Sequence, residues 1–110
     1  MSNEKTARIR ELNDAFRKTF SGGKVTVTAG VNSLPEDTML EVLEKVKSFS
    51  DFTPDNDPHG EHDFGAIEVA GQKYFWKIDC YDAHLEYGSE DPSDPSQTTR
   101  VLTIMLPQEY

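Results

Sequence analysis

The sequence predicts one α+β domain over residues 1–110, with a mainly antiparallel four-stranded sheet and two helices on one face. Two segments carry apolar residues at the three- and four-residue steps of an amphipathic helix. Four shorter segments alternate between apolar and polar residues, or are rich in β-branched and aromatic residues, as strands are. Their order along the chain is α-β-α-β-β-β, and short connections allow such elements to pack as one layered domain.

The first helix is predicted over residues 4–20, where apolar residues recur at helical spacing with charged residues between them. These apolar positions are Ile9, Leu12, Phe16 and Phe20. Glycines at 22 and 23 end the helix, because glycine readily adopts the left-handed conformation that follows a helix. Residues 24–28 then alternate, which predicts a half-buried strand.

The second helix is predicted to begin after Ser33, because Ser33 and Glu36 have the spacing of a capping box and Pro35 is tolerated in a first turn. Its apolar stripe is predicted to contain Met39, Leu40, Leu43, Val46 and Phe49. The three remaining strands are predicted over residues 64–70, 73–81 and 98–106, with a hairpin at the glycine between the first two. Tyr74, Trp76, Ile78 and Cys80 are expected to share the inner face.

The charge is distributed unevenly along the chain. The 110 residues include 20 acidic and 11 basic side chains, for a formal charge of −9. Residues 51–94 hold 12 of the acidic side chains but only two basic ones, Lys73 and Lys77, which predicts a negative surface in this part of the molecule. A negative protein is a poor direct ligand for nucleic-acid phosphates and for anionic lipid.

Cys80 is the single cysteine and cannot form an intramolecular disulfide, and residues 1–10 are charged rather than apolar as in a signal peptide. No apolar run approaches the roughly 18 residues that a membrane-spanning helix needs. These observations predict a cytoplasmic protein that does not enter a membrane.

Residues 55–63, Asp-Asn-Asp-Pro-His-Gly-Glu-His-Asp, concentrate the residue types found in metal sites and in acid–base sites. His59 and His62 are three residues apart, unlike the four-residue step of the zinc-protease helix. A calcium-loop pattern also fails, because Ala66 occupies the twelfth position, where a bidentate Glu is needed. We therefore predict no bound metal or cofactor and no catalytic residue, and the alternative is metal-dependent or acid–base catalysis. The catalytic alternative would use Asp57, His59, His62 and Asp63.

Four stretches resemble the signature of an uncharacterised bacterial domain family. They are residues 12–17, 51–65, 75–79 and 99–106, and the resemblance extends over nearly the whole chain. That family is familiar mainly from proteobacterial plasmids and other mobile elements, and no reaction or cofactor is established for it. Mobile elements often carry small acidic proteins that disable host defences, so an inhibitor of the anti-CRISPR or anti-restriction type is an expectation from this context and not from the family's fold, since a fold does not itself specify a function.

The function predicted from these observations is binding of a basic nucleic-acid-binding protein or complex by carboxylates that imitate nucleic-acid charge. Residues on one face of a strand recur every roughly 6.6 Å, about twice the rise between nucleotides of one DNA strand, so carboxylates on a sheet are expected to resemble a phosphate row. The predicted partner-binding residues are Asp55, Asp57, His59, Glu61, His62, Asp63, Asp79, Asp82, Glu86, Glu90, Asp91 and Asp94.

Overall fold

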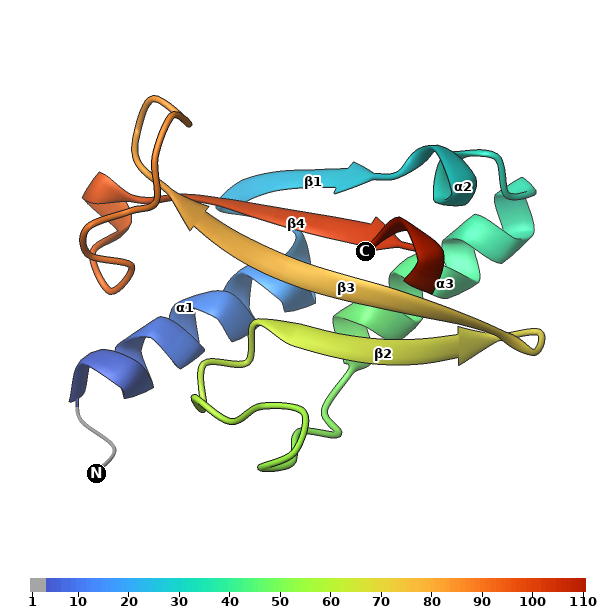
Figure 1. The fold of residues 1–110 in the computed structure, drawn as a ribbon, viewed down its shortest axis with the longest axis horizontal. Helices are drawn as coiled ribbons and strands as arrows, with labels where there is room; N and C mark the ends of the chain where they lie inside the picture. The colour runs from blue at the N-terminus through green and yellow to red at the C-terminus, as the bar shows by residue number, and fades with distance from the viewer. Residues whose placement is uncertain (1–3) are drawn as a thin grey trace.

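The four predicted strands form one sheet in the order β1-β4-β3-β2 in the computed structural model, which describes residues 4–110 (Figure 1). The strands are β1 (Gly23–Val27), β2 (Phe64–Val69), β3 (Gln72–Tyr81) and β4 (Thr99–Met105). The α-helices are α1 (Glu4–Thr19), α2 (Ala29–Asn32) and α3 (Glu36–Ser48), and two 3₁₀ turns are η1 (Pro95–Gln97) and η2 (Pro107–Glu109). The α+β class is confirmed.

The sheet is mixed, which corrects the prediction of a mainly antiparallel one. β2 and β3 form the expected antiparallel hairpin, and β3 pairs antiparallel with β4. β1, however, lies at the edge beside the last strand and runs parallel to it, with Val25 opposite Leu102. The two strands are separated by about two-thirds of the chain, so no turn constrains their relative direction, and the alternation of residues within a strand is the same for either direction.

The core lies between the sheet and the two long helices, which cover the same face of the sheet (Figure 1). Side chains from α1, α3 and the inner face of the sheet meet there. The fully enclosed members include Phe16, Val42, Val46, Trp76, Leu102 and Ile104. The inner face predicted for β3 is confirmed by the burial of Tyr74, Trp76 and Ile78, whereas Cys80 is only half-buried. Full burial of an apolar core side chain such as Phe16, Leu102 or Ile104 contributes about 1.5–3 kcal/mol to the stability of the fold.

The region before α3 differs from its prediction. Residues 29–32 form the additional short helix α2, and the hydroxyl of Ser33 donates to the Gly30 carbonyl. Ser33 therefore does not cap α3, which begins at Glu36 after Pro35.

The buried stripe of α3 also differs from its prediction. It contains Val42, whereas Leu40 is 57% exposed. Leu40 fits helical spacing equally well in the sequence, and only the position of the sheet decides which side of the stripe is covered.

The end of the chain is fixed against α2 by Glu109. Its carboxylate accepts hydrogen bonds from the Thr28 hydroxyl and from the backbone N–H groups of Gly30 and Leu106. The Thr28 hydrogen bond, together with the two backbone hydrogen bonds, lowers the pKa of Glu109 from its ordinary 4.5.

No helix within residues 4–110 is both long enough and apolar enough to cross a membrane.

Candidate functional site

A stripe of polar side chains on α1 holds the α3–β2 loop, residues 49–63, against the body of the domain. The stripe consists of Arg10, Asn13, Asp14 and Arg17. These positions are three and four residues apart and therefore share one side of the helix. Arg10 donates to the Gly60 carbonyl at 2.9 Å, and Asn13 donates to the Glu61 carbonyl at 2.9 Å. The helix thus binds successive backbone groups of the loop.

Arg17 makes the most enclosed contacts of this stripe, with 1% of its surface exposed. Its Nε donates to the Val46 carbonyl at 3.1 Å, and its Nη2 donates to the Phe49 carbonyl at 2.8 Å. Its Nη1 lies 3.1 Å from the carboxylate of Asp14. The guanidinium therefore satisfies carbonyls at the end of α3, where helical partners are missing, and fixes the point at which the loop begins.

His62 is enclosed by two carboxylates and one aromatic ring. Its Nδ1 donates to Asp14, with 2.9 and 3.0 Å to the two carboxylate oxygens, and its Nε2 lies 3.5 Å from the carboxylate of Asp57. The imidazole stacks on Phe52, with the ring centroids 3.7 Å apart. His62 has a φ of +54°, which costs a non-glycine residue about 1–3 kcal/mol, so these contacts hold a strained backbone position.

A cavity of about 550 Å³ opens between α1 and the α3–β2 loop. Its walls include Arg10, Phe52, Asp57, His59 and His62. General-base catalysis or metal binding needs an imidazole nitrogen that is free to meet a substrate or a metal, and both nitrogens of His62 already face carboxylates. Over residues 4–110 no three His, Cys, Asp or Glu side chains are grouped so that they would hold a metal ion. This geometry favours a structural role for His62.

Two carboxylates at the end of the α3–β2 loop are destabilised in their ionised form. Burial, and next the charge of Asp63, raises the pKa of Glu61 above its ordinary 4.5. Burial likewise raises the pKa of Asp63 above its ordinary 3.8, with a contribution from Asp57. The carboxylate of Asp79 on β3 has a different environment. It lies on the outer face of the sheet and forms an ion pair with Lys77 at 3.2 Å.

The β3–β4 loop, residues 82–98, contains carboxylates that are fixed by the loop itself. The carboxylate of Asp82 accepts hydrogen bonds from the backbone N–H groups of His84 and Glu86, at 3.0 and 3.1 Å. The hydrogen bond from Glu86 lowers the pKa of Asp82 below its ordinary 3.8. Because these bonds favour the ionised form, Asp82 carries a fixed negative charge at neutral pH.

Asp91 and Asp94, further along the β3–β4 loop, also accept hydrogen bonds from residues of the same loop. The Ser93 hydroxyl donates to Asp91 and lowers its pKa from the ordinary 3.8. The side chain of Gln97 donates to Asp94 at 2.8 Å and likewise lowers the pKa of that carboxyl. Asp91 also lies 3.7 Å from Lys5 of α1, so part of its charge is balanced within the domain.

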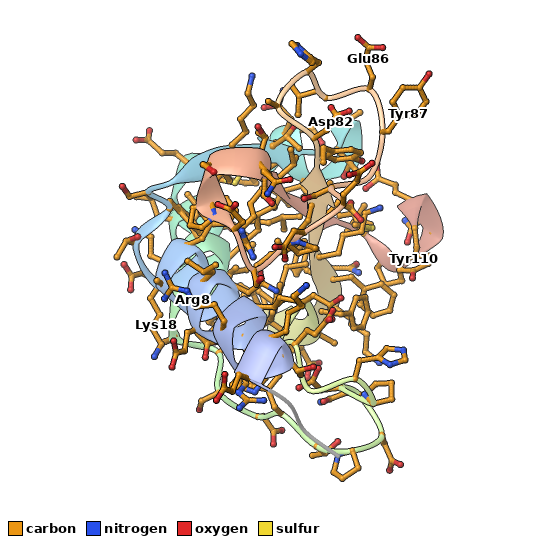
Figure 2. All side chains as sticks on the ribbon, turned by 90° about the vertical axis from the view of Figure 1, so that its left-hand side faces the viewer. Arg8, Lys18, Asp82, Glu86, Tyr87 and Tyr110 are labelled. Carbon is orange, nitrogen blue, oxygen red and sulfur yellow. The ribbon has the colours of Figure 1, made fainter. Side chains whose placement is uncertain are left out.

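Two further carboxylates of the β3–β4 loop form no hydrogen bond or ion pair with the described residues. Glu86 and Glu90 are exposed, and neither forms an ion pair with any residue that the structure describes. Tyr87, between them, is 73% exposed. Figure 2 shows Glu86 and Tyr87 at the outer end of this loop, pointing into solvent and away from the basic side chains of α1 that the figure labels. The loop therefore presents free acidic groups next to an exposed aromatic ring.

The structure divides the predicted partner-binding residues into two groups. Asp55, Asp57, His59, Glu61, His62 and Asp63 lie in the α3–β2 loop, and Asp82, Glu86, Glu90, Asp91 and Asp94 lie in the β3–β4 loop. The two loops flank α1 at one end of the molecule and lie on opposite sides of it (Figure 2). Only Asp79 lies in a strand, so the expected row of carboxylates along the sheet is wrong. Asp and Asn side chains bond turn amides readily, which explains their concentration in loops.

The sequence interpretation did not identify the residues that hold the two loops. Asn13, Arg17 and Arg100 are buried, with 1%, 1% and 4% of their surfaces exposed. Arg100 donates through Nε to the Asn13 side chain at 2.7 Å and through Nη2 to the Pro92 carbonyl at 2.6 Å. Asn13 therefore holds the α3–β2 loop directly and the β3–β4 loop through Arg100 of β4. The sequence contained one indication that Asn13 is buried: it follows Ile9 by four residues and therefore lies on the same, buried side of the helix.

Comparison with known proteins places this arrangement in a family. A family model described as "Protein of unknown function (DUF3768)" matches residues 27–109. The chain belongs to this family. The DUF3768 match includes both acidic loops and β2, β3 and β4, and α1 precedes it. This confirms the resemblance to an uncharacterised domain family. No curated protein and no solved structure in the comparisons matches the chain.

Proposed function

We propose that this chain is a non-enzymatic protein-binding module whose β3–β4 loop contacts a basic surface of a nucleic-acid-binding partner. One observation carries the proposal: residues 82–98 contain five carboxylates and no Lys or Arg. Three of these carboxylates are held by hydrogen bonds that keep them ionised, and the other two are exposed and unpaired within the described chain. Fixed charges on an exposed loop are favourable for binding because little side-chain freedom is lost on association.

The proposed partner uses Lys and Arg to bind nucleic-acid phosphates, and the module would occupy the same basic surface. Host-defence complexes of the CRISPR or restriction type are the partner class that we propose, in line with the resemblance to proteins of mobile elements. The carboxylates that imitate phosphates would be held by turn hydrogen bonds rather than by a strand. Charge complementarity of this kind accelerates association and weakens as salt rises.

The structure determines which residues are suitable for a test. Replacing Asp82, Asp91 or Asp94 would remove turn hydrogen bonds as well as charge, so a loss of binding would have two explanations. Glu86 and Glu90 offer a cleaner change, because their carboxylates accept no hydrogen bond from the described residues. The double variant Glu86→Lys/Glu90→Lys therefore changes charge without loosening the loop.

The experiment begins with affinity capture of the tagged protein from its host, followed by titration against the purified partner. The matched control is Glu44→Lys/Glu68→Lys, which reverses two exposed carboxylates on α3 and β2 and gives the same net charge. We expect roughly tenfold or greater weakening for the loop variant and little change for the control, since exposed ion pairs contribute about 0.2–1 kcal/mol each and reversal adds repulsion. Excess nucleic acid should displace the protein. Binding that is insensitive to salt, or equally weakened in both variants, would contradict the proposal.

A further inference from the structure

A cavity of about 440 Å³ lies within the β3–β4 loop, between its two arms. Its lining includes Asp82, His84, Tyr87 and Glu90, together with Ser96 and Gln97 of η1. It is separate from the cavity beneath the α3–β2 loop, with which it shares no lining residue. Its size is within the range of pockets that hold a small ligand or a side chain.

The cavity is held open by backbone contacts at its base. The Asp82 N–H donates to the Tyr87 carbonyl at 2.8 Å, and Gly88 forms a bridge to Tyr81 at the end of β3. The Ser89 N–H donates to the Cys80 carbonyl at 2.9 Å. The backbone path of the loop around the cavity is thus set before any partner arrives, which reduces the backbone entropy lost on binding.

The chemistry of the lining selects a flat cation. Asp82 and Glu90 give the cavity negative charge, and no Lys or Arg lines it. The Asp82 carboxylate is occupied by two backbone donors, so Glu90 is the carboxylate that is free to accept new hydrogen bonds. The exposed ring of Tyr87 provides a face on which a cation can stack. A guanidinium combines planarity, stacking and a fork of N–H donors, whereas an ammonium is compact and strongly hydrated.

We propose that this cavity receives an arginine side chain of the partner protein, with the guanidinium stacked on Tyr87 and hydrogen-bonded to Glu90. The inference rests on the proposed function and adds to it a specific residue type. A divalent cation is a poorer occupant, since the described residues contain no group of three His, Cys, Asp or Glu side chains arranged to hold one. Tyr and Arg, with Trp, are also the residue types on which binding energy at protein interfaces concentrates.

The test uses two fluorescein-labelled peptides, octa-arginine and octa-lysine, whose binding to the folded full chain is followed by fluorescence anisotropy at low salt. We expect the arginine peptide to bind several-fold more tightly than the lysine peptide. Tyr87→Ala should weaken arginine binding by about two- to fivefold, which corresponds to a cation–π contact at an exposed site, and should remove most of the preference for arginine. Glu90→Gln should weaken it by a similar factor.

The control variant is Glu68→Gln, which removes one exposed carboxylate from β2, outside the cavity. Amide chemical shifts in a ¹⁵N-labelled sample should change mainly in residues 82–98 when the arginine peptide is added. The proposed arginine site would be refuted if both peptides bound equally and if Glu90→Gln and Glu68→Gln caused the same loss of binding. That result would leave the proposed function, binding of a basic partner by the acidic loop, intact. No binding of either peptide at low salt would count against both proposals.

Discussion

Arg17→Met is the substitution for which the structure predicts the largest loss of stability. The guanidinium is 1% exposed and donates to the carbonyls of Val46 and Phe49, and it pairs with Asp14. It also lies 5.3 Å from the ring centroid of Phe52 and 5.1 Å from that of Trp76. Methionine would retain much of the apolar packing but would leave the Phe49 carbonyl without its donor, and it would remove one of two donors from the Val46 carbonyl and from the Asp14 carboxylate.

The expected loss is about 3–5 kcal/mol, because two hydrogen bonds from a charged donor to the Val46 and Phe49 carbonyls are lost, at about 1.5–3 kcal/mol each. A domain of this size has a free energy of unfolding of about 5–15 kcal/mol, and each kcal/mol lowers its melting temperature by about 4 °C. The melting temperature should therefore fall by roughly 12–20 °C. Arg17→Lys should give a smaller loss, because an ammonium keeps the charge but lacks the planar fork that reaches separated acceptors.

Urea unfolding provides the measurement, followed both by the fluorescence of Trp76, the single tryptophan, and by far-ultraviolet circular dichroism. Arg8→Met is the matched control on the same helix, since Arg8 is exposed and its ion pair among residues 4–110 is a surface pair with Glu11. It should change the free energy of unfolding by less than about 0.5 kcal/mol. An Arg17→Met protein within about 1 kcal/mol of the wild type would refute the anchoring role of this residue.

Four other predictions follow from the same contacts. Glu61 has a raised pKa, so the folded state binds its proton more tightly and protonation stabilises the fold as the pH falls; Glu61→Gln should raise the melting temperature at pH 7, with the gain shrinking towards pH 4.5. Gly65→Ala should destabilise by about 1–3 kcal/mol in urea unfolding, because its Cβ would lie within 2.6–2.8 Å of the Trp76 ring, whereas Gly88→Ala should be tolerated. Hydrogen exchange should show protected amides in the α3–β2 loop, where Gly60 donates to a carbonyl within the loop, and rapid exchange there would contradict an ordered loop. Elemental analysis of protein purified without chelators should find no stoichiometric transition metal, and a metal lost on replacing both histidines of that loop would favour the catalytic alternative.

Most of the local structure follows from periodicity in the sequence. The apolar spacing in α1 and the alternation in β3 correctly place Ile9, Phe16, Tyr74, Trp76 and Ile78 inward, because the residues that share one face of an element follow from its period. The acidic character of the two loops was also evident from composition. Local patterns were less informative where two registers fit equally well, as with Leu40 and Val42 of α3.

The candidate site depended on information that composition does not contain. The five acids of the β3–β4 loop count equally toward its charge, yet the structure separates Asp82, Asp91 and Asp94, whose short side chains bond their own turns, from Glu86 and Glu90, which accept no hydrogen bond from the described residues. That distinction depends on the backbone conformation of each turn, which determines where the N–H groups point.

By itself, the sequence determined where the two long helices and the four strands form, which face of β3 is buried, and where negative charge accumulates, because each of these depends on residues close together in the chain. Only the tertiary structure decided that β1 runs parallel to β4 and that Asn13 bonds the α3–β2 loop and, through Arg100, the β3–β4 loop. The Asn13 contacts join residues 48 and 87 positions apart. Such pairings are selected by how the whole chain packs, since a buried amide or guanidinium is stable only where folding supplies its hydrogen-bond partners.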